Sequence, residues 1–96
     1  MNIVIHTAAM AELQQACDYY RDQASSLVAE NFLAQVDHAI GCLREYPELG
    51  QPVSSRLRTL PLRQFPYSMI YRLQTQTLTI LTIAHQRRRP GYWAGR

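Results

Sequence analysis

The apolar residues of this 96-residue chain recur with two different periods, and the change comes near its middle. Those from Ala9 to Tyr20 are spaced three or four positions apart, which predicts one face of a helix that ends at about Gln23. A second stripe from Ala29 to Leu43 predicts another helix, ended by Pro47 and Gly50. The connection is only about three residues long, so the two helices should form an antiparallel hairpin.

Hydroxyl side chains precede both apolar stripes. Thr7 is expected to be the N-cap of the first helix, and Ser25 or Ser26 the N-cap of the second. Before the first helix, Asn2–His6 has three β-branched residues in a row and predicts a short strand.

The second half favours strands. Arg56–Phe65 contains Pro61, which has no N–H to donate to a ladder and therefore indicates an edge strand or a bulge. Tyr67–Leu73 alternates, Leu78–His85 is rich in Ile, Leu and Thr, and Gln74–Gln76 between them is expected to be a hairpin turn.

The order of elements predicts an α+β fold. A short N-terminal strand and a helix hairpin should pack on a three- to four-stranded, mainly antiparallel sheet. Which side of the last strand faces the helices stays open, because two apolar sets alternate along it. One set is Leu78, Ile80 and Ala84, and the other is Leu81 and Ile83.

Length and composition limit the class of protein. A chain of this size should form a single domain, residues 1–96, with residues 86–96 as an arginine- and aromatic-rich tail. No apolar run is long enough to span a bilayer, and the N-terminus lacks the features of a signal peptide, so a cytoplasmic protein is expected. Cys17 and Cys42 lack metal-type spacing and are expected to be core thiols rather than a disulfide.

Charge divides the chain as sharply as the apolar period does. Residues 1–48 carry seven acids and two arginines, whereas residues 49–96 carry eight arginines and no acid, for a net charge of +3. This asymmetry predicts an anionic partner or an acidic partner chain for the second half. With no acid after Glu48, the second half cannot form a carboxylate metal site or a pair of catalytic carboxylates by itself.

Several short motifs, in this order and at this spacing, resemble one known family. The chain is similar to the ParE branch of the RelE/ParE toxins of bacterial type II toxin–antitoxin systems, and the resemblance covers nearly all of it. The motifs are Ala11–Leu13, Tyr19–Tyr20, Pro47–Gly50, Arg63–Tyr67, Ile70–Arg72, Ile83–His85 and Arg88–Trp93.

The resemblance implies a small α+β toxin that is wrapped by the flexible C-terminal segment of an acidic, ParD-like antitoxin. ParE members are associated with poisoning DNA gyrase, whereas RelE members cut mRNA, usually on the ribosome. We therefore expect a gyrase-directed toxin without cofactor or metal. A metal-independent mRNA endoribonuclease and a non-toxic interaction module remain the alternatives.

The residues themselves support RNA cleavage only weakly. Cleavage by the RNA 2′-OH needs a base, an acid and cations. His85 is the candidate base, Tyr92 the candidate acid, and Arg72 and Arg87 the candidate phosphate ligands. Arginines beside aromatic residues suit stacking on bases and protein interfaces equally well. The expected target-binding residues are Arg63, Arg72, His85, Arg87, Arg88, Arg89, Tyr92 and Trp93.

Antitoxin binding is expected at two places. Arg56 and Arg58 lie on or beside the expected edge strand, where a peptide could add as a further strand and bring acids to the arginines. Alternatively, these charges only prevent edge-to-edge aggregation. An amphipathic antitoxin helix is expected to bind a groove on the helix hairpin, lined by Tyr19, Leu27, Val28 and Phe32.

Overall fold

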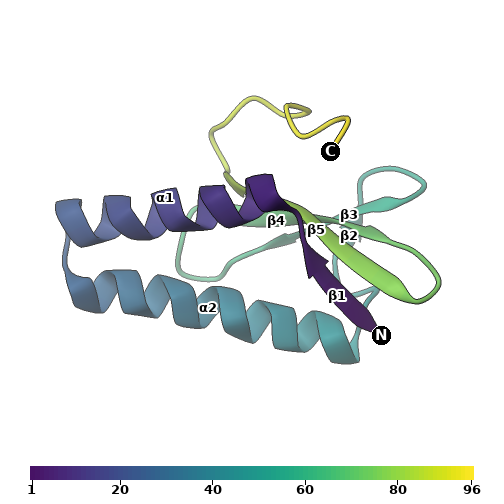
Figure 1. Cartoon of the computed structure of the whole chain (residues 1–96), viewed down its shortest axis with the longest axis horizontal. Helices are drawn as coiled ribbons and strands as arrows, with labels where there is room; N and C mark the ends of the chain where they lie inside the picture. The colour runs from purple at the N-terminus through teal and green to yellow at the C-terminus, as the bar shows by residue number, and fades with distance from the viewer.

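A helix hairpin and a five-stranded mixed sheet make up the computed structural model, which describes residues 1–96 (Figure 1). The sheet order is β1-β5-β4-β3-β2; β1 is parallel to β5, and the other neighbours are antiparallel. The predicted α+β fold is confirmed, with one strand more than expected. The elements are β1 (Asn2–Ile5), α1 (Thr7–Gln23), α2 (Ser26–Glu45), β2 (Gln51–Pro52), β3 (Leu57–Pro61), β4 (Tyr67–Leu73) and β5 (Thr77–His85).

Both helices begin with a side-chain cap. Ser25 Oγ accepts a hydrogen bond from Val28 N at 3.1 Å, as predicted for α2. The prediction for α1 is wrong by one residue, because Thr7 is already helical and His6 is the N-cap. Nδ1 of His6 accepts from Ala8 N at 3.0 Å, so the imidazole takes the place of the expected hydroxyl.

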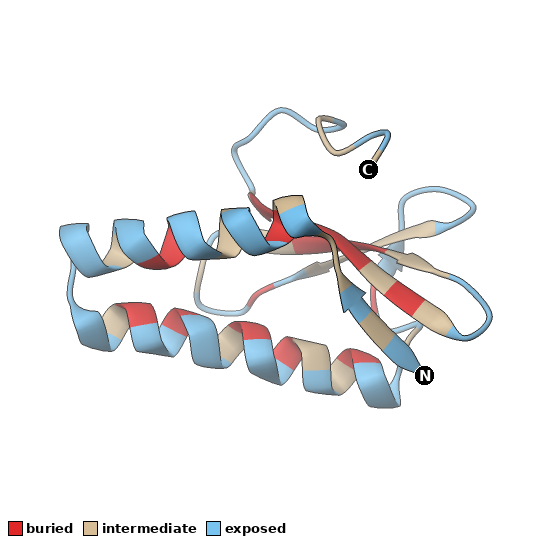
Figure 2. Cartoon of the chain, viewed as in Figure 1, coloured by how far each residue is buried: buried red, intermediate tan, exposed pale blue.

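The hydrophobic core lies between the helix hairpin and one face of the sheet, and the buried residues of α2 line the side that faces it (Figure 2). Four aromatic rings meet here at centroid distances of 5.1–6.2 Å, contributed by Tyr20, Phe32, Phe65 and Tyr67. Phe32 is completely buried among them. Neither helix is long and apolar enough to cross a membrane.

A β-bulge decides which side of β5 faces the helices. Tyr71 pairs with Ile80, but Ile70 pairs with Thr82, so Leu81 is an extra residue on β5. The extra residue reverses the alternation, and the core-facing residues become Leu78, Ile80 and Ile83. Each of the two apolar sets in the sequence is therefore correct for only part of the strand.

The segment between α2 and β3 is held by Tyr71 and Arg58. The Tyr71 hydroxyl donates to Pro47 O at 2.7 Å and accepts from Gly50 N at 2.9 Å. Arg58 Nη1 donates to Glu48 O and Gly50 O at 3.0 and 2.8 Å. A Cβ on Gly50 would lie 2.6 Å from the Tyr71 hydroxyl oxygen, so this close approach requires glycine.

These contacts place β2 beside β3 and correct the expected edge. Gln51 and Pro52 pair with Thr59 and Arg58, so β3 is not an edge strand at those residues. No sequence pattern indicated β2, because it has two residues and one is proline. Pro61 ends β3 beyond the reach of β2, where its missing N–H costs no ladder bond.

Replacing Tyr71 with phenylalanine should destabilise the protein by about 1–3 kcal/mol, because the change leaves Pro47 O and Gly50 N without their partner. The effect is read from urea unfolding followed by circular dichroism. Tyr46 is 64% exposed, so water serves its hydroxyl, and Tyr46→Phe is the matched control with no expected change. Equal stabilities of the two variants would contradict the role of the Tyr71 hydroxyl in holding this segment.

Candidate functional site at the C-terminal tail

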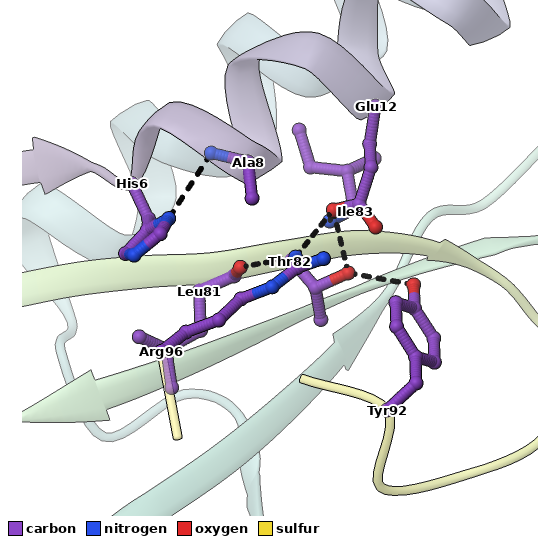
Figure 3. A network of polar contacts seen from close by, with 8 residues as sticks. All are labelled: His6, Ala8, Glu12, Leu81, Thr82, Ile83, Tyr92 and Arg96. Carbon is purple, nitrogen blue, oxygen red and sulfur yellow. Dashed lines mark hydrogen bonds and ion pairs between the residues drawn. The ribbon is translucent and has the colours of Figure 1, made fainter. Parts of the chain in front are cut away.

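The open half of the β5 edge is the starting point of the site. β1 pairs with β5 only from Thr77 to Ile80, so no strand covers the β5 residues that follow. Glu12, near the start of α1, lies beside this edge, and its side chain accepts a backbone hydrogen bond that no neighbouring strand receives (Figure 3). Its Oε1 accepts from Thr82 Oγ1 at 2.8 Å and from Ile83 N at 3.3 Å.

Arg96 joins the tail to the same carboxylate. Its Nη1 lies 2.9 Å from Glu12 Oε1 and also donates to Leu81 O at 2.9 Å (Figure 3). Leu81 is the extra residue of the bulge, and its carbonyl thus receives a partner from the tail. The backbone carbonyl of Arg96 accepts a further hydrogen bond from Arg72 Nη1 on β4, at 3.3 Å. The end of the tail is therefore fixed to both α1 and the sheet.

The direction of the hydrogen bonds around Thr82 follows from its neighbours. The single hydroxyl proton of Thr82 goes to the Glu12 carboxylate, which can only accept when it is ionised. The Tyr92 hydroxyl, 2.7 Å from Thr82 Oγ1, must then be the donor in that pair. Tyr92, Thr82 and Glu12 form one chain of donors that ends on the carboxylate.

Two pKa shifts in this chain have opposite directions. Burial tends to raise the pKa of Glu12, but the hydrogen bonds from Arg96 and Thr82 and the charge of Arg96 outweigh it, so that pKa is lowered. Burial raises the pKa of Tyr92, and the nearby Glu12 charge adds to the effect. At neutral pH, Glu12 is ionised and the Tyr92 phenol keeps its proton.

The aromatic residues of the tail pack against its arginines and against the sheet. The Arg88 guanidinium carbon lies 4.0 Å from the Tyr92 ring centroid, a cation–π contact. Tyr92 and Trp93 meet edge to face with centroids 5.2 Å apart. Trp93 lines a cavity with Ile70 and Ala84, so the tail covers the side of the sheet turned away from α2 (Figure 1).

A separate cavity of about 190 Å³ lies beside the Glu12 network. It brings together residues from α1, β4, β5 and the tail, and it is rich in tyrosine. Its walls include Glu12, Tyr19, Tyr67, His85, Arg88 and Tyr92. Tyr19 is 58% exposed, which leaves an aromatic surface open to a partner next to the charge of Arg88.

Only part of the expected nuclease set comes together. His85 and Tyr92 share this cavity, but Arg72 contacts the far end of the tail and Arg87 is exposed outside it. Nδ1 of His85 accepts from Arg87 N at 3.1 Å, and its ring packs on Tyr67. The Tyr92 hydroxyl already donates to Thr82, so neither group is poised for proton transfer in this arrangement.

The other expected target-binding residues lie on different parts of the surface. Arg89 is exposed on the tail beside Arg87 and Arg88. Arg63 is also exposed, but it lines a different cavity with residues of α2. The structure therefore groups His85, Arg88, Tyr92 and Trp93 around the tail and leaves Arg63 apart.

The expected antitoxin-binding residues are only partly accessible. Leu27 is 65% exposed, Tyr19 is exposed and Val28 is half-buried, but the prediction for Phe32 is wrong because the sheet and neighbouring rings cover it completely. Arg56 is exposed. Arg58 is half-buried, and its Nη1 already donates hydrogen bonds to backbone carbonyls of the segment before β2.

Sequence reasoning missed Glu12, Thr82 and Arg96 as members of one site. Glu12 lies 70 positions from Thr82 and 84 from Arg96, so no local spacing connects them. One signal was available in the sequence. Glu12 is an acid three positions after Ala9, and Ala9 belongs to the apolar stripe of the first helix.

The fold and the site define a small α+β protein with an arginine- and tyrosine-rich surface suited to a macromolecular partner. A family model described as "ParE toxin of type II toxin-antitoxin system, parDE" matches residues 3–90. The chain belongs to this ParE toxin family.

A solved structure shares the fold. It is described as "Chromosomal ParDE TA system from P. aeruginosa", and it is 22% identical in sequence with a TM-score of 0.77. The match covers 88% of this chain and 95% of the other. No curated protein matches the chain.

Proposed function

We propose that this ParE-family toxin acts by binding DNA gyrase and is neutralised by an acidic, ParD-like antitoxin. The observation that carries the proposal is the tail surface, where Arg88 stacks on Tyr92 beside the exposed Tyr19. Arginine and tyrosine are the residues that most often dominate protein interfaces. The family and the related ParDE structure support both the toxin role and an antitoxin partner.

The arrangement of charges supports an acidic antitoxin. Of the eight arginines in the second half, only Arg96 forms an ion pair with an acid of the protein. Exposed cations attract an acidic segment and accelerate its association. Exposed Leu27 and Tyr19 supply apolar contacts on the helix hairpin for the same partner.

The gyrase proposal predicts that replacing Arg88 with alanine weakens inhibition. The concentration of purified toxin that halves gyrase supercoiling should rise by about tenfold, because the change removes a cation stacked at the centre of the proposed interface. Arg44→Ala is the control, since Arg44 is an exposed arginine at the end of α2 and should leave inhibition unchanged. Normal supercoiling at a large excess of the unmodified toxin would contradict the proposal.

RNA cleavage is the second candidate, because His85 and Tyr92 line one cavity. It requires both groups to give up their present hydrogen bonds, with Arg87 N and with Thr82, before they transfer a proton. Tyr92→Phe separates the two functions. The variant keeps the ring under Arg88 but loses the hydroxyl proton, so it should retain gyrase inhibition and lose any cleavage of transcripts. Unchanged growth on expression without the antitoxin would instead support a non-toxic interaction module.

A further inference from the structure

Cys42 and His38 form a pair on α2 that the site described above does not use. Cys42 Sγ lies 3.6 Å from His38 Nε2, and residues four positions apart share one face of a helix. Cys42 is half-buried and His38 is exposed, which corrects the expectation that both cysteines lie in the core. The thiol is therefore held beside a base at the surface.

A cavity of about 250 Å³ opens on this pair. Its apolar walls include Ala39 on α2 and Leu60 and Leu62 from the end of β3 and the residues after it. Arg63 lines the same cavity, is exposed, and forms no ion pair within the protein. Nucleophile, base, cation and cavity thus come together from two separate segments of the chain.

We propose that Cys42 is a site of reversible thiol–disulfide exchange with small anionic disulfides such as glutathione disulfide. Unprotonated Nε2 of His38 accepts the thiol proton, and the Cys42 thiolate attacks one sulfur of the disulfide. The reagent's S–S bond breaks as the new S–S bond forms. One glutathione thiolate leaves and takes up a proton, so the small disulfide is the oxidant. Arg63 attracts the glutathione carboxylates.

Cys17 provides an internal comparison. It is buried in the core, and burial raises the pKa of its thiol, so less of it is ionised near neutral pH. It also lies outside the cavity. The proposed modification should therefore distinguish the two cysteines of one chain, and it is independent of whether the protein binds gyrase.

The experiment treats the full-length reduced protein with glutathione disulfide and follows the intact mass and the modified peptide over time. We expect one glutathionyl group on Cys42, added about tenfold faster than on Cys17 and faster than on Cys42 of the urea-unfolded chain. Reduction with dithiothreitol should restore the original mass. Cys42→Ser should abolish the fast reaction and leave the circular dichroism spectrum unchanged.

Two variants test the neighbouring groups. His38→Gln should slow the reaction about tenfold, and Arg63→Gln should slow it about fivefold with glutathione disulfide but not with the cationic disulfide cystamine. Faster modification of Cys17, a Cys42 rate no higher than in the unfolded chain, or equal effects of Arg63→Gln on both reagents would overturn the proposal.

Discussion

Replacing Glu12 with alanine is expected to destabilise the protein by about 2–4 kcal/mol at neutral pH. The change removes the acceptor of Thr82 Oγ1 and Ile83 N and leaves the Arg96 cation without its carboxylate. The two charged side chains are only 11% and 20% exposed, so water replaces these bonds poorly. Urea unfolding measures the loss.

The same change should release the tail. Trp93 is the only tryptophan of the chain, and it lines a cavity together with Ile70 and Ala84. Loss of the Arg96 anchor should move its fluorescence emission to longer wavelength before global unfolding. Glu30→Ala is the control, because Glu30 is an exposed glutamate on α2 without a hydrogen bond or ion pair to another side chain. An unchanged emission together with a stability loss like that of the control would contradict the role of Glu12.

The contribution of Glu12 should also depend on pH with a definite sign. Its pKa in the folded protein is below the ordinary value of 4.5, so the folded state favours the ionised carboxylate. The stabilisation is fully present above the pKa of the unfolded chain and is lost as the pH falls through the lower, folded pKa. Glu12→Gln should therefore show a weaker loss of stability on acidification than the unmodified protein.

Replacing Phe32 with alanine is expected to cost about 3–5 kcal/mol, the usual range for removing a fully buried aromatic ring. The ring contacts Tyr20, Phe65 and Tyr67, so its loss leaves a cavity between α2 and the sheet. Thermal and urea unfolding measure the effect.

The neighbouring residue on α2 is the matched control. Leu33 is 42% exposed, and Leu33→Ala should change stability by less than about 1 kcal/mol. When antitoxin binding is measured, the same two variants also distinguish a buried residue, Phe32, from an exposed one, Leu33. A Phe32→Ala protein as stable as Leu33→Ala would contradict the buried position of the ring.

The helix hairpin and all the strands except β2 were predictable because they depend on local patterns. The spacing of apolar residues from Ala9 to Leu43 is that of a helix face, and most side chains at those positions form the core or pack against it, although Leu33 is exposed. The turn between Tyr67–Leu73 and the last strand was also correct. Phe32 belongs to this stripe and is buried, so only its assignment to an antitoxin groove was wrong: periodicity shows which face of a helix is apolar but not which residues a particular sheet covers. The core position expected for Cys42 rested on its lack of metal-type spacing, which says nothing about burial.

The candidate site was predictable only in its parts. The position of Arg88, Tyr92 and Trp93 after the last strand indicated a tail that either packs on the domain or contacts a partner. The tail does lie against the sheet. Its anchor could not be predicted, since Glu12 and Arg96 lie near opposite ends of the chain and the sheet alone brings them together.

The sequence by itself determined the α+β class, the helix hairpin and the separation of acids from arginines, since these depend on residue type and on spacing along the chain. Only the tertiary structure decided which side of β5 is inward and where the tail lies. The reason is that one extra residue, Leu81, reverses the alternation of the strand where it pairs with β4. Because β1 is short and pairs with only the first part of β5, Glu12 and the tail contact the remaining part of the β5 edge.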